Sequence, residues 1–401
     1  MQSIQSFFLP LNYSLYANIE KWETTQIGRT IDVYTESSFP DLKFAEIAIF
    51  NVPEYEGSKN SFSDSDCKIR AFFYSFHQSN LPKIVDLGVL KIMPTRKESF
   101  AIIENVCMDL LNNGIIPIII GGGHDISYAI YKAYAKLEKH INLTVVDKKF
   151  DLGLENDNLA SFSHLSKIIS YKPSYLFHYT HLAFHSYLVS HIAIDMLNAM
   201  NFDPIRLGDL KENFNEVEPI MRNTDLFCFD ITSIQHAYAA ANIYSSPNGL
   251  SGEEACKIMR YAGVSDKVSA VGLFEYNQNL DLNSQTAYLL AEMLWYFIDG
   301  YKIRKNELNP NIKNCTKYTV AFEDGKNEIA FYKSQNSGRW WMGVPFQKQG
   351  IKKNQTYYVA CSYRDYEIAN QGEIPERWVK TFNKFMLTTV YLCLDFNDLS
   401  Y

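Results

Sequence analysis

The strongest structural signal in this sequence is a run of apolar residues that ends in three glycines and a histidine. The run covers Ile115–Ile120, and Gly121–Gly123 lead directly into His124 and Asp125. An uninterrupted apolar run of this length, rich in β-branched residues, is typical of a strand buried on both faces of a sheet. Glycines at its end permit a tight turn. We therefore expect this strand to stop at a functional site.

Three further apolar segments also end in acidic residues, and helices separate the predicted strands. The acidic residues at these strand ends are Asp147 and Asp151, Asp230, and Glu275. Helices are predicted over Thr95–Asn112, Ile126–Leu137 and Ser284–Tyr301. Alternating strands and helices indicate an α/β fold with a doubly wound parallel sheet. The carboxyl ends of such strands share one crevice, so we expect these four strand ends to converge there.

The pattern divides the chain into three segments. Residues 1–43 show no clean periodicity and are predicted to form an N-terminal extension packed on the core. Residues 44–303 carry the strand–helix alternation of the α/β domain. From residue 304 to 401, short strands with polar turns predict a small α+β appendage. We expect it to close with a helix over Glu373–Phe385 and a last strand over Thr388–Leu394.

Charge and composition narrow the class of protein. The net charge of −7 disfavours nucleic acid as a partner, because a surface that binds it would be basic. Met1–Pro10 lack the features of a signal peptide, and no stretch approaches the roughly 20 apolar residues that span a bilayer. The seven cysteines are odd in number and contain no CxxC pair, which is typical of reduced thiols. We therefore expect a cytoplasmic protein that binds no membrane.

The polar residues at the strand ends are metal-ligand types. One imidazole and three carboxylates form a set that a hard or borderline divalent ion prefers. The four residues are His124, Asp147, Asp151 and Asp230. Each alone is as readily a loop-capping carboxylate or a hydrogen-bonded histidine. Their shared position at strand ends favours a metal site.

Residues 121–127 resemble the first signature of the ureohydrolase family, which comprises arginase, agmatinase and formimidoylglutamase. The second signature, Asp-Ala-His-x-Asp, corresponds to Asp147–Asp151, and the third, Phe-Asp-x-Asp, to Phe229–Thr232. Glu275 at a strand end, followed by a long helix, extends the similarity across residues 44–303. The resemblance implies an arginase-like three-layer fold. It also implies hydrolysis of a C–N bond in a small guanidino or formimino compound.

The resemblance further implies two manganese ions that share a hydroxide, which attacks the guanidinium or formimino carbon. The ligands of the first ion would be His124, Asp147, Asp151 and Asp230, and all four are present. Two ligands of the second ion correspond to Lys149 and Thr232. A protonated amine cannot bind a metal ion, and a threonine hydroxyl replaces a carboxylate poorly. We therefore expect one divalent ion, manganese, with no metal at all as the alternative.

Charge counting suggests what Lys149 does. The family site balances four aspartates against two divalent ions, whereas three aspartates here would face one ion and one ammonium. Both sums vanish. We therefore expect Lys149 to occupy the space of the second ion. In the alternative without metal, Lys148 and Lys149 both pair with the aspartates.

Three further residues are candidates for catalytic roles. By resemblance, Glu275 would pair with the substrate guanidinium, although an ordinary salt bridge at a strand end is the competing interpretation. His164 lies 13 residues after Asp151, where arginases carry a proton-shuttling histidine, but the same position suits a surface histidine. Asp125 is a second candidate for proton transfer. The histidines at 178, 181 and 185 are predicted to be packing or surface residues.

Two functions from different classes follow. The first is a ureohydrolase-type enzyme with an altered, one-metal site. The second is a catalytically silent member of the family that acts as a binding or scaffold protein, which the lost ligands at Lys149 and Thr232 favour. The family commonly forms trimers or hexamers, so a homo-oligomer is expected unless residues 304–401 cover that interface.

Overall fold

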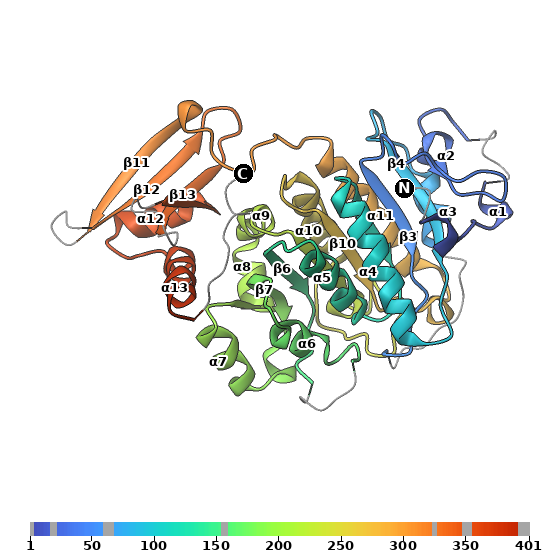
Figure 1. The fold of residues 1–401 in the computed structure, drawn as a ribbon, viewed down its shortest axis with the longest axis horizontal. Coiled ribbons are helices and arrows are strands. Elements are labelled where there is room, and N and C mark those ends of the chain that lie inside the picture. The colour runs from blue at the N-terminus through green and yellow to red at the C-terminus, as the bar shows by residue number, and fades with distance from the viewer. Residues whose placement is uncertain are drawn as a thin grey trace.

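The computed structural model describes residues 4–16, 22–58, 68–153, 159–322, 327–346 and 355–391. Its main body is built on a ten-stranded sheet in the order β1-β4-β3-β5-β10-β9-β6-β7-β8, with β2 also paired to β4 (Figure 1). All pairs are parallel except β1 with β4. The strands are β1 (Phe8–Leu9), β2 (Asp32–Val33), β3 (Ile47–Asn51), β4 (Ile84–Leu90), β5 (Ile116–Ile120), β6 (Ile141–Val146), β7 (Leu176–Phe184), β8 (Asp203–Arg206), β9 (Leu226–Asp230) and β10 (Ala270–Phe274). This confirms the predicted α/β fold.

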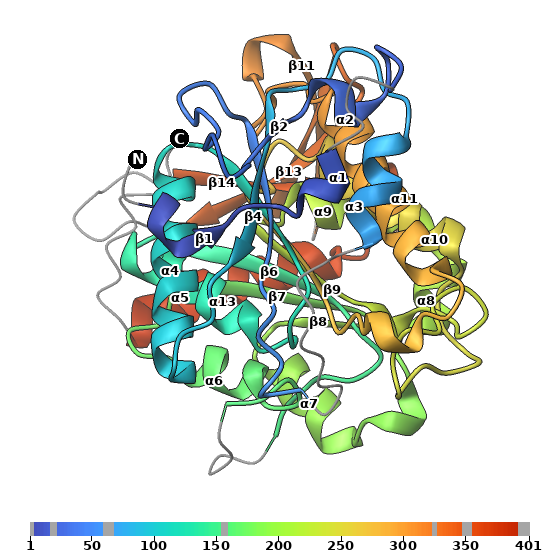
Figure 2. The ribbon, with the colours of Figure 1, turned by 90° about the vertical axis from the view of Figure 1, so that its right-hand side faces the viewer.

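Helices cover both faces of this sheet, which gives three layers (Figure 2). The layer on one face contains α4 (Arg96–Asn112), α5 (Ile126–Lys136), α6 (His164–Ser170) and α7 (His191–Ala199). The opposite layer contains α3 (Lys68–Ser75), α8 (Leu207–Glu212), α9 (Val217–Arg222), α10 (Gly252–Val264) and α11 (Gln285–Tyr301). Each layer buries its apolar side chains against its own face of the sheet, so two separate cores form.

Local signals explain where the helices begin. Thr95 and Glu98 form a capping box at the start of α4, and Ser251 and Glu254 form another at α10. Each box satisfies backbone N–H groups that the first helical turn leaves without partners. The remaining short helices are α1 (Tyr13–Tyr16), α2 (Ile27–Thr30), and the 3₁₀ turns η1 (Gln5–Phe7), η3 (Ser186–Leu188), η4 (Phe214–Glu216), η5 (Ile231–Ser233), η6 (Gln278–Leu280) and η7 (Ile312–Asn314).

The strand order places the predicted strand ends side by side. Strands β5, β10, β9 and β6 are consecutive neighbours in the centre of the sheet. Leu273 of β10 pairs with Ile120 of β5, and Phe274 pairs with Asp230 of β9. Their carboxyl ends therefore lie at one edge, as in other open parallel sheets with a crevice there.

The C-terminal part forms a separate four-stranded antiparallel sheet with two helices. The strands β11 (Cys315–Phe322), β12 (Asn327–Ser334), β13 (Trp340–Phe346) and β14 (Gln355–Cys361) pair in sequence order, and α12 (Tyr363–Asn370) and α13 (Glu376–Tyr391) follow. Trp340, Val359 and Phe385 belong to its own apolar core. The predicted strand over Thr388–Leu394 is wrong at 388–391, where α13 continues, and residues 392–394 lie outside the described part. Once the earlier turns are packed, a helix extends at one hydrogen bond per residue.

The appendage rests on the amino ends of the central strands. Asn223, which precedes β9, exchanges hydrogen bonds with the backbone of Ala360 in β14. Lys380 of α13 forms an ion pair with Asp203, the first residue of β8. The appendage and the predicted functional edge therefore lie at opposite ends of the strands. In the part of the chain that the structure describes, no helix has the length and hydropathy needed to cross a bilayer.

Candidate metal centre

The glycine turn after β5 delivers His124 to the carboxyl edge of the sheet. Gly121 and Gly122 have φ angles of +86° and +77°, a region that favours glycine. A Cβ on Gly122 would also lie 2.7 Å from the carbonyl oxygens of Val52 and Glu54. The chain can pass through this narrow turn only without side chains, which explains the glycine run.

Two carboxylates of the site also occupy unusual backbone conformations. Asp151 has a φ angle of +51° and Glu275 one of +69°. A left-handed conformation is costly for residues other than glycine and persists where the surrounding fold imposes it, often at functional sites. Both residues follow a strand end, so the backbone turns sharply while the carboxylates stay at the edge of the sheet.

His124 lies at the centre of a cluster of carboxylates. Its side chain is fully buried, and neither ring nitrogen has a hydrogen-bond partner among the described residues. The Nδ1 atom lies 3.4 Å from a carboxylate oxygen of Asp147, of Asp151 and of Asp230. This spacing exceeds that of a good hydrogen bond.

The donor set fits a divalent metal ion. Ligand atoms about 2.0–2.4 Å from one ion lie roughly 3–3.5 Å from each other, which agrees with the 3.4 Å spacings around His124. One nitrogen and three carboxylate oxygens also match the chemistry of such ions. The buried Nδ1 of His124, which has no hydrogen-bond partner among the described residues, is the atom that a bound cation would satisfy, so the residues present can hold one.

The carboxylates repel each other strongly without a cation. Burial and the charge of Asp147 raise the pKa of Asp230 to about 6, and the same two causes raise the pKa of Asp151 well above its usual value. Burial acts to raise the pKa of Asp147 also, but the imidazole of His124, which lies 3.4 Å away, outweighs it and lowers that pKa. Such opposed shifts within one cluster are typical of functional sites.

His164, from the first turn of α6, lies against this cluster. Its ring is 1% exposed and lies 4.2 Å from the ring of His124, measured between centroids. Among the described residues, two groups of side chains could hold a metal ion: His124 with Asp147 and Asp230, and His124 with Asp151 and His164. The competing interpretation of His164 as a surface histidine is therefore wrong. Its spacing from Asp151 was the signal in the sequence.

Glu275 is held by donors from three segments. Its Oε1 accepts hydrogen bonds from the His124 backbone N–H at 3.0 Å and from the Ser161 hydroxyl at 2.6 Å. Its Oε2 accepts one from the Ser58 hydroxyl at 2.7 Å. Nothing in the sequence pattern singled out either serine, because both lie in loops far from the strand ends. Together they fix the orientation of a buried carboxylate beside His124.

Asp125 and Arg96 form an ion pair beside this cluster. Arg96 also pairs with Glu54, at 3.3 Å, so a carboxylate on either side engages its guanidinium. Asp125 is fully buried, and its contact with the Ser161 hydroxyl is long, at 3.4 Å. The structure thus places Asp125 next to the residues that hold Glu275, with its charge already engaged by Arg96.

The two lysines after Asp147 do not lie as expected. Lys149 is exposed and forms no ion pair in the described part of the chain, so the expectation that its side chain fills the space of a second ion is wrong. Lys148 is instead the buried one, 6% exposed, and its Nζ donates to the carbonyl of Tyr244. The alternative without a metal ion, in which Lys148 and Lys149 both form ion pairs with the aspartates, is contradicted too. Burial lowers the pKa of Lys148, which the charges of Asp230 and Asp147 partly offset.

Thr232 is buried, and its backbone N–H donates to Asp230 at 2.7 Å.

The remaining histidines have separate roles. His181 lies in β7, and its Nε2 contacts the carbonyl oxygen of Asp147 at 2.8 Å, which helps to fix that strand end. His185 contacts the Tyr187 hydroxyl, and His178 contacts Asp203 at the other end of β7.

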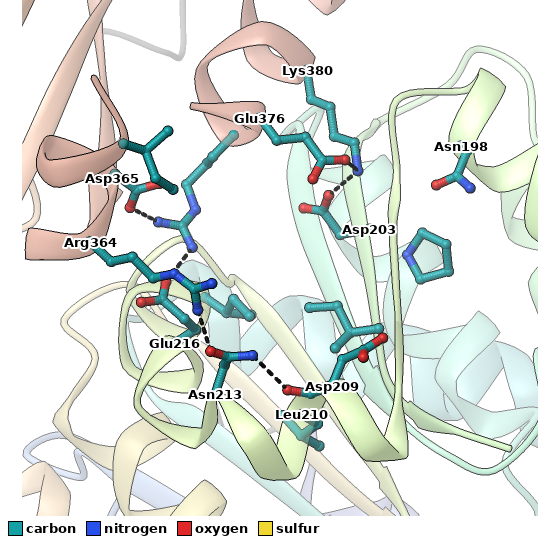
Figure 3. A pocket seen from close by; sticks show the side chains of 15 residues that line it. Asn198, Asp203, Asp209, Leu210, Asn213, Glu216, Arg364, Asp365, Glu376 and Lys380 are labelled. Carbon is teal, nitrogen blue, oxygen red and sulfur yellow. Dashed lines mark hydrogen bonds and ion pairs between the residues drawn. The ribbon is translucent and has the colours of Figure 1, made fainter. Parts of the chain in front are cut away.

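A cleft of about 360 Å³ lies elsewhere, between α8 of the main body and helices α12 and α13 of the appendage. Figure 3 shows Lys380 reaching Asp203 and Arg364 reaching Asn213 across it. Among the described residues that line this cleft, none belongs to the cluster around His124. Its paired charges join the appendage to the main body.

Comparison with known families identifies the group to which this site belongs. The profile of the arginase family matches residues 67–299, which include the glycine turn, all four strand ends and most of α11. The chain belongs to the arginase family. This confirms the predicted membership. The N-terminal strands and the appendage lie outside the matched range.

Curated arginase-family relatives share modest identity with the chain. It is 22% identical over 232 residues to formimidoylglutamase of Bacillus subtilis. That alignment covers 55% of this chain and 71% of that protein. It is 27% identical over 196 residues to formimidoylglutamase of Staphylococcus aureus, across 45% of this chain and 60% of that protein. The alignment with the second relative thus spans less than two thirds of its length.

Solved structures show the same fold. Formiminoglutamase of Trypanosoma cruzi, solved with Mn²⁺, superposes with a TM-score of 0.60 over 67% of this chain and 97% of that one, at 19% identity. Agmatine ureohydrolase of Thermoplasma volcanium superposes with a TM-score of 0.56 over 72% of this chain and 98% of that one, at 18% identity. These relatives are covered almost completely, so this chain is the longer protein in each pair.

Proposed function

We propose that this protein is a ureohydrolase that uses one divalent metal ion to hydrolyse a C–N bond in a formimino or guanidino compound. The observation that carries the proposal is the buried His124, whose ring nitrogen lies 3.4 Å from three carboxylate oxygens. The printed activities of the relatives, formimidoylglutamase and agmatine ureohydrolase, support the substrate class. The formimino class is favoured because the curated relatives have that activity.

The proposed metal ligands are His124, Asp147, Asp151 and Asp230. When bound, a divalent ion lowers the pKa of a coordinated water and stabilises the developing negative charge. Manganese is the proposed ion, since the Trypanosoma cruzi relative was solved with it. We propose a single ion because Lys149 and Thr232 stand where the family pattern has two further ligands. The buried ammonium of Lys148 adds a positive charge near Asp230 and Asp147.

The chain's own residues have distinct proposed roles. Glu275 would bind the cationic amidine of the substrate, because its carboxylate is buried and oriented by Ser58 and Ser161. Asp125 is proposed as a positioning residue, since its ion pair with Arg96 engages the charge that proton transfer would need. We further propose that residues 44–303 carry the activity and that 1–43 and 304–401 are additions to that domain. A cytoplasmic location remains our expectation.

A second candidate function is a silent member that binds without catalysis. The observation that favours it is the occupied state of Glu275, which accepts three hydrogen bonds from within the chain. A substrate amidine would have to share these acceptors. The strained, buried carboxylates argue for an active site, because a scaffold gains nothing from them.

Metal content is the first test. The purified protein is loaded with manganese and desalted, and its metal is measured by elemental analysis. One equivalent supports the proposed site, two contradict the one-ion proposal, and none contradicts metal dependence. The loaded protein is then assayed for formamide release from formiminoglutamate and for urea release from agmatine and arginine.

A double variant separates the two candidate functions. It carries Lys149→His and Thr232→Asp, which restore the two residue types of the family pattern. Turnover by the loaded wild type supports the enzyme. Turnover only in the double variant supports a silent member that has kept its substrate pocket. Absence of turnover in both contradicts the proposed substrate class. His191→Ala, a change at an exposed histidine of α7, is the control for handling and folding.

A further inference from the structure

We infer that a groove along α11 binds an organic cation, either a quaternary ammonium or a protonated amine. The groove has a volume of about 540 Å³, which lies in the range of small-molecule sites. Residues of α3 and α10 also line it, and α11 packs against both of these helices (Figure 2). Among the described residues that line the groove, none is a proposed metal ligand. The inference therefore adds a second site and does not depend on the proposed function.

Aromatic rings form much of the wall of this groove. Tyr288 and Tyr296 lie eight residues apart on α11, so they occupy the same face of the helix. Phe72 of α3 packs edge-on against Tyr288, with ring centroids 5.1 Å apart. Tyr238 joins them from the loop before α10. The three tyrosines are between 37% and 44% exposed, so a ligand can reach their rings from solvent. The faces of such rings attract cations.

The charge of the groove is negative. Its lining includes Glu253 of α10 and Glu292 of α11, whereas no Lys, Arg or His occurs among the described residues that line it. Neither glutamate forms an ion pair within the part of the chain that the structure describes. Glu292 lies four residues from Tyr288 and from Tyr296, so it is on the same helix face as both rings. A carboxylate between aromatic rings is a combination that recognises ammonium groups.

The surroundings of Glu292 supply no compensating charge. Its side chain is half-buried, and burial raises its pKa. Burial, with a contribution from the charge of Glu292, also raises the pKa of the Cys256 thiol to about 12. Cys256 belongs to the lining of the groove, so the carboxylate lies beside a buried part of its wall. A carboxylate that is partly removed from water without a counterion is unfavourable, and a bound cation would offset that cost.

Choline and its neutral isostere 3,3-dimethylbutanol test the inference, because the two have the same shape and differ in charge. Each is titrated into the full-length protein at low ionic strength and followed by isothermal titration calorimetry. We expect choline to bind saturably below about 10 mM and the isostere to bind at least about tenfold more weakly. Spermidine is titrated in the same way. Tighter binding of choline assigns the groove to quaternary ammonium compounds, and tighter binding of spermidine assigns it to protonated amines.

Four variants locate the bound cation. We expect Glu292→Gln and Tyr288→Leu each to weaken choline binding by roughly threefold to tenfold, because the first removes the charge and the second removes a ring face. The matched controls Glu367→Gln and Tyr13→Leu change the same residue types at exposed positions outside the groove. Their affinity for choline should stay within about twofold of the wild type.

Three outcomes would overturn the inference. Equal affinity for choline and its isostere would show an apolar groove without preference for charge. Weaker binding in Glu275→Gln but not in Glu292→Gln would place the cation at the candidate metal centre. Absence of saturation by both choline and spermidine below about 10 mM would show that the groove holds no such cation. The comparison of choline with its isostere uses the wild type alone, so it does not depend on folding of a variant. Metal content and turnover test the proposed function separately.

Discussion

Lys148 and Lys149 are neighbours in the chain but have opposite environments. The first is buried at 6% exposure, and the second is exposed. At a strand end, successive side chains point to different sides, so a one-residue step moves an ammonium from solvent to the site. Charge counting placed the buried ammonium on Lys149, whereas the structure buries Lys148, whose Nζ donates to the Tyr244 carbonyl.

This difference predicts unequal effects on metal binding. In Lys148→Met, the loss of a buried positive charge near Asp230 and Asp147 should strengthen Mn²⁺ binding by roughly tenfold, about 1.4 kcal/mol. In Lys149→Met, the affinity should stay within about twofold, because solvent screens an exposed charge. Isothermal titration calorimetry on both variants measures the contrast. Equal effects would show that Lys148 does not act on the site.

At the scale of elements, α13 is attached to β7 and β8 through an unusual cluster. Lys384 of α13 is 8% exposed, contacts Nδ1 of His178, and lies near the rings of Phe177 and Phe202. Burial lowers the pKa of Lys384 to about 7, although the charge of Asp203 opposes this and that of Lys380 adds to it. The folded state therefore disfavours the ammonium form of Lys384.

This cluster predicts a pH dependence of stability. Between pH 7 and the ordinary lysine pKa of 10.5, the unfolded chain binds a proton at Lys384 that the folded chain lacks. The free energy of unfolding should therefore rise with pH in this range, by up to about 1.4 kcal/mol per pH unit. Below pH 7 the full destabilisation due to this group is present. Urea unfolding at pH 7 and 9 should show this rise in the wild type relative to Lys384→Met. A constant difference between the two would refute it.

Arg222, at the end of α9, forms a buried polar link between the main body and the appendage. Its guanidinium donates to the carbonyl oxygens of Trp340 and Cys361 and lies over the Trp341 ring. Arg222→Ala would leave two buried carbonyls with fewer partners, so we expect a loss of about 2–4 kcal/mol in the free energy of unfolding. The control Arg206→Ala removes an exposed ion pair and should cost at most about 0.5 kcal/mol. Similar losses in both variants would contradict this role.

At the scale of the whole molecule, the site and the appendage lie at opposite ends of the same central strands. A metal ion at the carboxyl edge would bind residues from the ends of three central strands, β5, β9 and β6, so it should stabilise the main body as a unit. At Mn²⁺ concentrations about 100 times the Kd, this stabilisation is about 2.7 kcal/mol. Thermal melts with Mn²⁺ and with EDTA measure it. Coincident melts at saturating Mn²⁺ would argue against binding to the native site.

The strand–helix alternation, the four polar strand ends and the residue types of a candidate metal site could be predicted from the sequence alone. These follow from local properties: apolar periodicity, β-branched runs, capping residues and the glycines that permit the turn before His124. The match of helix α4 to the predicted Thr95–Asn112 shows how strong such signals are. The tail of α13 shows their limit, because β-branched residues at 388–390 continue a helix.

Tertiary packing sets which strand ends are neighbours and which side chains complete the site. Ser58 and Ser161 reach Glu275 from loops 217 and 114 residues away in the chain. Such contacts depend on how the loops pack, and neither residue carries a periodic signal. The choice between Lys148 and Lys149 likewise depends on the direction of one side chain at a turn. Long-range packing sets that direction, since burial of a charged group is favourable only where partners from other strands surround it.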